Sequence, residues 1–388
     1  MSAAPDPSTH IHLAVALDGT GWHPASWREP DARPAELSSP RYWTDLVSEA
    51  ERGMLDFVTI EDGLTLQFEH PLRADERTDR VRGRLDAVLI ASRVAPVTSH
   101  IGLIPTAITT HTEPFHLSKA IATLDYVSSG RAGIRVQVSA SPDAAGHFGR
   151  REVLDGNGLL AEAADYVEVL RRLWDSWEDD AEIRDVATGR FVDRNKLHYI
   201  GFDGAWFSVK GPSITPRPPQ GQPIVAALGH GEAAHRLIAS SADVGFVTPH
   251  SSQDTTAIVD AIASHRATGA APVLVFADLV VFLDKTATAA AARRSRLNAA
   301  ADREYLSDAE VFAGTPEGLA DLLQEWHAAG AAGFRLRPAT VPHDLRQITG
   351  GLVPELRRRG AFRDSYPATT LRGTLDLSRP ANRYSTAR

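Results

Sequence analysis

The sequence contains no cysteine, and this absence excludes several kinds of chemistry. Disulfides, thiolate nucleophiles, iron–sulfur clusters and cysteine-ligated zinc sites all require a residue that the chain does not have. Only two methionines are present, so a site that generates an oxidant exposes few sulfur atoms to it. Any chemistry that this chain carries out proceeds without sulfur nucleophiles.

Long apolar runs and an excess of positive charge are also lacking. The longest strongly apolar stretch, residues 271–283, is interrupted by Pro272 and Asp278 and is shorter than the roughly 18 residues of a membrane span. The first ten residues, MSAAPDPSTH, do not resemble a signal peptide. The 41 Lys and Arg residues against 49 Asp and Glu give a net charge of −8, which predicts no general attraction to nucleic acid or anionic lipid. We therefore expect a cytoplasmic protein that binds neither nucleic acid nor membranes.

What the chain does have is a regular alternation of two patterns. Hydrophobic residues make up 43% of its 388 residues, enough for a sizeable core. Eight short apolar runs predict strands, and helical periodicity lies between them. This pattern favours an α/β fold, a (β/α)8 barrel formed by one domain over residues 1–388, over an open doubly wound sheet. The predicted strands are residues 10–17, 55–61, 101–108, 132–139, 224–228, 244–248, 273–282 and 333–336, and the predicted helices are residues 42–52, 85–94, 115–127, 159–177, 233–239, 255–265, 287–292 and 316–329.

Two segments do not follow the alternation. Residues 178–222 are polar and rich in turn-forming residues, which indicates an insertion lying on the barrel. The tail, residues 361–388, contains Pro367 and Pro380 and is expected to wrap around the surface or a partner subunit.

Histidines open the first predicted strand as the pair His10 and His12. An H-x-H pair can place two imidazoles on one face of a strand, as in barrel metal hydrolases. Metal sites in such barrels lie where the strands end, however, and these histidines lie where the strand begins. Solvated or structural histidines are therefore the favoured interpretation, and a metal hydrolase is a distant alternative.

Polar residues at the carboxyl ends of the predicted strands indicate a site there, because barrel active sites form at that end. Glu61 and Asp62 are not expected to act as an acid–base pair, since neighbours on a strand point to opposite faces. Further along, Gly229 to Glu232 follows a strand and opens a helix, where backbone N–H groups can face an anion. The strand-end residues are Asp18, Gly19, Glu61, Asp62, residues 106–111, Arg135, Gln137 and Ser139.

Several short blocks give the chain a family likeness. It resembles the bacterial luciferase-like flavin monooxygenases and, among them, the group of nitrilotriacetate monooxygenase component A. The blocks occur in the family's order over nearly the whole chain. They are GWHPASWREP at 21–30, YW at 42–43, ERG at 51–53, TEPF at 112–115, LDYVSSGRAG at 124–133, LWDSW at 173–177, FSVKGP at 207–212, PPQG at 218–221 and LVPELRRRG at 352–360.

The resemblance implies a (β/α)8 barrel that uses FMN reduced by a separate NAD(P)H-dependent flavin reductase. The reduced flavin would react with O2 to oxygenate a small organic substrate. The resemblance also implies a homodimer. Residues 178–222 would act as a lid that keeps water from the reacting flavin.

Carried over residue by residue, the resemblance gives a partial set of cofactor contacts. Asp62 matches a flavin-contacting Asp, and Thr106 lies on the segment that lines the flavin ring. The family's usual His, Tyr and Ser near the flavin are replaced by Gly156, Leu160 and Gly231. The remaining predicted cofactor-binding residues are Arg135, Gln137, Ser139, Gly229, His230 and the backbone of Gly231.

Two histidines are candidate proton donors near the oxygenating flavin, His23 and His111. A substrate pocket is predicted from side chains that suit an aromatic or acidic molecule, namely Trp22, His23, Trp27, Phe148 and Arg135.

Two other functions remain open at this point. A deazaflavin-dependent oxidoreductase of the same superfamily would transfer hydride instead of activating O2. A non-catalytic barrel that binds a flavin or another ligand would also account for the replaced residues at 156, 160 and 231.

Overall fold

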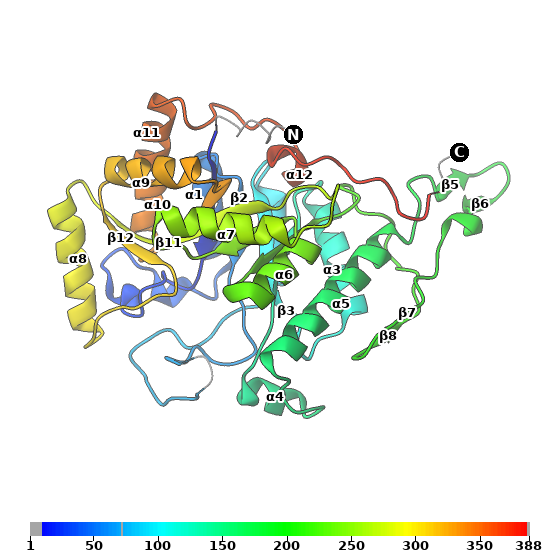
Figure 1. Ribbon diagram of the computed structural model, residues 1–388, viewed down its shortest axis with the longest axis horizontal. Helices are drawn as coiled ribbons and strands as arrows, with labels where there is room; N and C mark the ends of the chain where they lie inside the picture. The colour runs from blue at the N-terminus through cyan, green and yellow to red at the C-terminus, as the bar shows by residue number, and fades with distance from the viewer. Residues whose placement is uncertain (1–9, 71–72, 386–388) are drawn as a thin grey trace.

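Eight parallel strands form a closed barrel in the computed structural model, which describes residues 10–70 and 73–385 (Figure 1). Each strand pairs with its neighbour, and the pairing of β10 with β11 closes the ring. The ring runs through β1 (His12–Leu17), β2 (Phe57–Ile60), β3 (Gly102–Ile108), β4 (Gly133–Gln137), β9 (Ile224–Leu228), β10 (Val244–Val247), β11 (Leu274–Leu283) and β13 (Gly333–Pro338).

The predicted (β/α)8 barrel and its eight strands are confirmed. Every residue of β1 and β3 is buried, as expected for parallel strands that are covered by helices on one side and pack inside the barrel on the other. The helices are α1 (Pro40–Arg52), α2 (Ala87–Val94), α3 (Pro114–Val127), α4 (Pro142–Phe148), α5 (Gly156–Asp175), α6 (Gly231–Ser241), α7 (Ser252–Ser264), α8 (Ala287–Ala300), α9 (Pro316–Ala328), α10 (His343–Gln347), α11 (Val353–Arg358) and α12 (Leu371–Thr374).

Some elements were not predicted from the sequence. β12 (Glu310–Gly314) pairs only with the second half of β11 and stands outside the ring. It is short and partly exposed, so it lacks the continuous apolar run of the barrel strands. The short helices α4, α10, α11 and α12 have too few turns to show a clear periodicity.

Residues 178–222 form an irregular insertion with two small hairpins, β5 (Glu182–Asp185) with β6 (Arg190–Val192) and β7 (Phe202–Asp203) with β8 (Ser208–Val209). α5 runs antiparallel to the barrel strands, so the insertion leaves from the end of the barrel at which the strands begin. Gln220 returns there and donates its backbone N–H to Asp125, near the end of α3. The prediction that this insertion covers a site at the opposite end is therefore wrong in its placement.

A short helix of the tail closes the end of the barrel at which the strands begin. Leu371 and Leu375 of α12 are fully buried and belong to the same apolar cluster as Phe57, Phe246 and Phe276 of the barrel interior. This cluster fills the lower half of the barrel with apolar side chains. The tail thus packs against its own barrel, which is one of the two alternatives that the sequence left open.

Beside α12, the buried carboxylate of Asp56 holds the start of β1. It accepts hydrogen bonds from the Leu13 N–H at 2.7 Å and from Arg363 at 2.8 Å, and it pairs with His12 at 3.0 Å. Burial opposes the charge of His12, but Asp56 outweighs it and raises the pKa of His12 above its usual 6.5. His12 therefore has a structural role where the strand begins, as its position in the sequence indicates.

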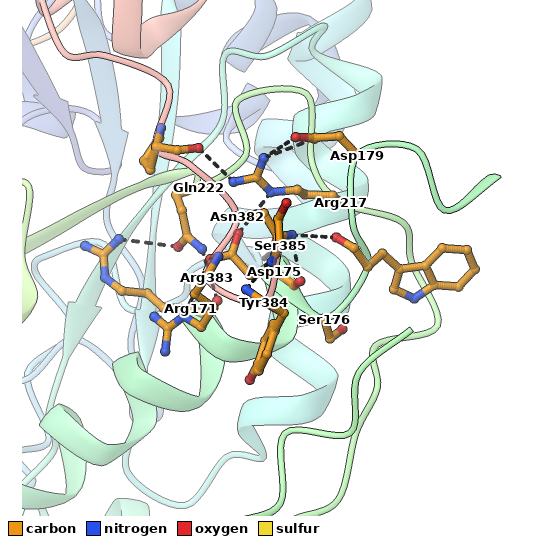
Figure 2. Close-up of polar contacts among 12 residues, drawn as sticks. Arg171, Asp175, Ser176, Asp179, Arg217, Gln222, Asn382, Arg383, Tyr384 and Ser385 are labelled. Carbon is orange, nitrogen blue, oxygen red and sulfur yellow. Dashed lines mark hydrogen bonds and ion pairs between the residues drawn. The ribbon is translucent and has the colours of Figure 1, made fainter. Parts of the chain in front are cut away.

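Further along the tail, a group of polar contacts joins it to the end of α5 and to the insertion (Figure 2). Arg217 donates to Asp175 at 2.9 Å, to Asp179 at 2.8 Å and to the Pro380 carbonyl at 2.8 Å. Asn382 donates to the carbonyls of Asp175 and Trp177, both at 2.8 Å. We call Asp175, Asp179, Arg217 and Asn382 the tail clamp.

Over residues 10–70 and 73–385, no helix combines the length and the apolar character that crossing a membrane requires.

Candidate active site

A cavity of about 1130 Å³ opens at the carboxyl ends of the barrel strands. Residues that follow β1, β2, β4 and β9 line it, together with the segment between α8 and β12. This is the end at which (β/α)8 barrels carry their active sites. Four of the predicted cofactor-binding residues line the cavity: Asp62, Arg135, Gln137 and Ser139.

Arg135 lies at the centre of the cavity floor and is almost fully buried. Its guanidinium donates to Glu61 at 2.7 Å, to the Thr106 hydroxyl at 2.8 Å and to the Gln137 side-chain carbonyl at 2.6 Å. Burial lowers the pKa of Arg135 to about 10, against the attraction of Glu61, so it remains a cation at neutral pH. The structure therefore brings Thr106, Arg135 and Gln137 together beside the carboxylate of Glu61, and their contact with a cofactor stays a prediction.

Two atoms of this group have no hydrogen-bond partner among the described residues: Nε of Arg135 and Oε1 of Glu61. Oε1 lies 3.6 Å from the guanidinium of Arg335, which is beyond hydrogen-bond distance. Buried polar atoms are normally paired, and unpaired ones in a cavity are candidates for contact with a ligand.

Beneath and beside this floor, β11 and β13 contribute a buried ionic network. Asp278 is completely buried and accepts hydrogen bonds from both Arg335 and Arg337. Arg337 continues to Asp308 at 2.6 Å and stacks over the ring of Trp22 at 4.6 Å. Although burial opposes its charge, the two arginines hold the pKa of Asp278 below its usual range. This network keeps charged groups rigid next to the cavity.

The wall of the cavity after β2 is a long segment, residues 61–86, whose described residues, 61–70 and 73–86, form no helix or strand. Asp62 fastens its two ends, because its carboxylate accepts from the N–H of Gly63 at 2.7 Å and of Ala87 at 2.9 Å. Burial raises the pKa of Asp62 above its usual value. Asp18 binds the same segment through Arg84 at 2.6 Å. This segment, and not residues 178–222, lies over the cavity.

The predicted anion site at Gly229 to Glu232 lies at the rim, and none of its residues lines the cavity. Gly231 begins α6 with a φ of +76°, and a Cβ at this position would meet open space. His230 is half-exposed and contacts Asp308 at 3.4 Å and the Thr248 hydroxyl at 3.1 Å. The structure therefore places a histidine and free backbone N–H groups beside the cavity mouth.

The two candidate proton donors differ in position. His23 borders the cavity but is fully buried, with Nε2 bonded to Asn298 at 3.1 Å and Nδ1 accepting from the Ala25 N–H. Burial lowers its pKa to about 4, so the ring is neutral at pH 7. His111 does not line the cavity; it stacks on Phe148, and burial followed by the charge of Arg151 lowers its pKa. Neither geometry favours proton donation at neutral pH.

Of the side chains predicted to form a substrate pocket, Trp22, His23 and Arg135 line the cavity. Trp27 donates its indole N–H to the Asp79 carbonyl and so supports the wall from behind. Phe148 is partly exposed on α4, next to His111.

Sequence reasoning missed several charged residues of the cavity. Arg335 and Arg337 lie two residues apart on β13, so both point into the barrel. The sequence signal that could have found them is the presence of two arginines and Asp278 in otherwise apolar strands. Because buried charges require partners, these residues could have been expected to pair with one another. The missed charged residues that line the cavity are Glu69, Arg80, Arg84, Arg303, Glu304, Asp308 and Arg337.

A closed barrel with a charged, partly unsatisfied cavity at the carboxyl ends of its strands has the architecture of a (β/α)8 enzyme. The family model described as luciferase-like monooxygenase matches residues 21–310. N-acetyl-S-(2-succino)cysteine monooxygenase of Bacillus subtilis (strain 168) is 32% identical over 97% of this chain and 98% of its own length. The chain belongs to the luciferase-like monooxygenase family, and the predicted enzyme class, a flavin-dependent monooxygenase, is confirmed.

Other similar proteins agree with this assignment. Nitrilotriacetate monooxygenase component A of Aminobacter aminovorans is 29% identical over 96% of this chain and 97% of its own length. The structure of EDTA monooxygenase from Chelativorans sp. BNC1 superimposes with a TM-score of 0.84 at 23% identity, over 95% of this chain and 99% of that chain. The fold therefore extends over nearly the full length of both chains.

Proposed function

We propose that the cavity binds FMN, that the flavin is used in its reduced form, and that O2 and a small organic substrate meet it there. The observation that supports this proposal is the floor formed by Arg135, Glu61 and Gln137, which offers unpaired polar atoms inside a chain of a monooxygenase family. A solved structure of the same fold, riboflavin lyase, holds modified FMN; it superimposes with a TM-score of 0.84 at 23% identity.

The residues present fit a flavin. An isoalloxazine has two apolar faces and a polar edge that accepts and donates hydrogen bonds. The cavity provides an apolar side from Leu160, Ala163 and Leu237, and a polar floor from Arg135 and Gln137. Its volume of about 1130 Å³ exceeds the range of about 300–1,000 Å³ that is usual for small-molecule pockets. It therefore has room for a cofactor and a substrate together.

The phosphate of FMN would be held differently from the pattern that the resemblance implies. Gly231 provides no hydroxyl, so the first turn of α6 would offer only its backbone N–H groups and its dipole. His230 stands immediately before this turn and is already bonded to Asp308 and Thr248. Ser139 adds a hydroxyl on the neighbouring strand end.

When bound, reduced FMN supplies the electrons that activate O2. The chain's own residues bind and orient the flavin and the substrate, and they exclude water. Arg135 is a fixed cation at the floor, suited to a polar edge of the flavin that gains negative charge. The described residues of the segment after β2, 61–70 and 73–86, cover the mouth, and Asp62 fastens the two ends of the segment, which limits access of water.

Two protein partners belong to the proposal. A separate NAD(P)H-dependent reductase would supply the reduced flavin. The name "component A" of the Aminobacter aminovorans relative supports a multi-component system. We also propose a homodimer, which sedimentation of the purified chain would detect.

Binding of the cofactor is the direct test. Tryptophan fluorescence of the purified chain would be followed under anaerobic conditions during titration with oxidised FMN, photoreduced FMN and a deazaflavin cofactor. We expect reduced FMN to bind most tightly. In the variant Arg135→Gln, we expect affinity to fall by about tenfold or more, because a charge-assisted contact is lost.

The matched control is Arg93→Gln, which removes the same charge from the exposed surface of α2. It should leave flavin affinity unchanged. Preference for the deazaflavin would overturn the proposal in favour of a hydride-transferring oxidoreductase. Failure of a folded sample to bind either cofactor would overturn it in favour of a non-catalytic barrel.

A further inference from the structure

Five arginines line the cavity within the described part of the chain, and four of them have a close carboxylate partner. Arg84 is 2.6 Å from Asp18, Arg135 is 2.7 Å from Glu61, and Arg337 is 2.6 Å from Asp308. Arg303 forms an ion pair with Glu69. Each of these four cations is neutralised within the protein.

Arg80 is the exception. Its nearest carboxylate oxygen, on Glu69, is 3.6 Å away, which is longer than a hydrogen bond. Its side chain is only 8% exposed, and its Nε has no hydrogen-bond partner among the described residues. Burial, followed by repulsion from Arg77, lowers its pKa. A partly buried cation that is left so poorly paired is costly to the free protein.

The surrounding charges leave this cation uncompensated. Glu69 is already shared, because Arg77 contacts it at 3.2 Å and Arg303 also pairs with it. The neighbouring carboxylates are occupied as well. Within ion-pair distance, four arginines of this region share three carboxylates: Arg77, Arg80, Arg82 and Arg303 with Glu69, Asp75 and Asp79.

Arg80 lies across the cavity from the predicted phosphate site. It belongs to the segment after β2, whereas Gly231 follows β9, and β3 and β4 stand between these strands in the ring. Its contact with Glu69 places it beside the segment that carries Arg303. The side of the cavity near Arg80 is therefore available to the substrate when the flavin occupies the side near α6.

We propose that Arg80 binds a carboxylate of the substrate, so that the oxygenated substrate is a small carboxylic acid. This inference rests on the proposed function for the position of the flavin. The planar guanidinium presents paired donors that match the two oxygens of a carboxylate. Leu66 and Phe68 line the cavity near this segment and would contact the apolar part of such a molecule.

The family alone does not decide this point. Relatives are named for nitrilotriacetate and N-acetyl-S-(2-succino)cysteine, which carry carboxylates, and also for dibenzothiophene sulfone and dimethyl sulfide, which carry none. The unpaired cation in this cavity favours the first kind of substrate.

Calorimetric titration of the full chain with succinate, citrate and nitrilotriacetate would test the proposal, with succinamide as the uncharged counterpart of succinate. At least one of the three acids should bind, and succinamide should not. In Arg80→Gln we expect affinity for that acid to fall by about tenfold or more. Arg80→Lys should lose less affinity for the acid, because it keeps the charge without the planar donor pair. It also replaces Arg80→Gln as the test variant if Arg80→Gln does not fold.

Arg73→Gln is the matched control, since it removes an exposed arginine from the same segment. It should bind the acid as the unaltered chain does. Equal affinity in Arg80→Gln, or no binding of any of the three acids, would overturn the proposal. So would loss of FMN binding without loss of riboflavin binding in Arg80→Gln, because Arg80 would then hold the flavin phosphate.

The same titrations separate this inference from the proposed function. If FMN binds but no acid does, the monooxygenase proposal stands and the carboxylate inference fails. If an acid binds through Arg80 but no flavin binds, the cavity recognises acids without the proposed chemistry.

Discussion

The two ends of the barrel contain the same types of charged residues, but these residues differ in how they are paired. At the end where the strands begin, buried ions have close partners: Asp56 with Arg363 and His12, and Asp175 with Arg217. Inside the cavity at the end where the strands finish, Arg80 has no partner within hydrogen-bond distance among the described residues, and Arg135 and Glu61 each leave one atom unpaired. At the other end, Nε of Arg363 is also unpaired but lines no ligand cavity that the described residues show. The first arrangement stabilises the fold, and the second leaves binding capacity for ligands. This division predicts that substitutions at the two ends have different consequences.

The largest expected effect on stability is at Asp56. Its carboxylate is fully buried, and Asp56→Ala would leave Arg363 without this partner. We expect the free energy of unfolding in urea to fall by about 3–5 kcal/mol, with flavin binding at the other end unchanged in the folded fraction. Asp364→Ala is the control, because this neighbouring carboxylate is 95% exposed. Similar losses of unfolding free energy in Asp56→Ala and Asp364→Ala would contradict the idea that the paired, buried ions at this end stabilise the fold.

Leu371 gives a second, apolar test of the same end. Leu371→Ala would leave a void between α12 and the barrel strands and should cost about 3 kcal/mol in urea unfolding. Leu306→Ala, on the opposite rim, removes an equal side chain that is 82% exposed, and it should change stability by less than about 0.5 kcal/mol. A large loss of unfolding free energy in Leu306→Ala would show that the rim also stabilises the fold.

A pH effect should follow from His12. Asp56 raises the pKa of His12 above 6.5 in the folded protein, although burial opposes this. A raised pKa stabilises the folded state fully below the unfolded value, and this stabilisation is lost as the pH rises through the folded value. The unaltered chain should therefore lose more stability than His12→Gln when urea unfolding is compared at about pH 6 and about pH 8. Equal losses of stability in the unaltered chain and in His12→Gln would show that His12 is neutral over this pH range.

The smallest expected effect concerns His23. With a pKa of about 4, its ring should give no titration by nitrogen NMR between about pH 5 and about pH 8. His23→Gln serves to assign the signal. A titration near neutral pH would restore His23 as a proton donor and would place an acid–base group at the cavity after all.

The barrel itself could be predicted because fully buried parallel strands are continuous apolar runs, such as residues 101–108. β12 could not, because its five residues pair outside the ring and are only partly buried. The placement of residues 178–222 failed for a different reason. A sequence shows that a segment is inserted, but the direction of the preceding helix α5 decides which end of the barrel it reaches.

The site was predictable only where a polar residue ends a strand. Arg135 and Gln137 follow that rule, and the structure brings them together with Thr106. Arg80 does not, because it lies within an irregular segment whose path depends on tertiary contacts. Its importance comes from the carboxylate that is missing near it, and sequence alone does not show which charges remain unpaired.

The closure of the lower end by α12 and the tail clamp also has a consequence for biosynthesis. β1 is synthesised long before its partner strand β13, and the lower end of the barrel beneath it is closed only by residues 371–382. Until those residues have been made, Phe57 and Phe276 lack part of their cover. Nascent chains that stop before α12 would therefore expose an apolar opening to chaperones and proteases.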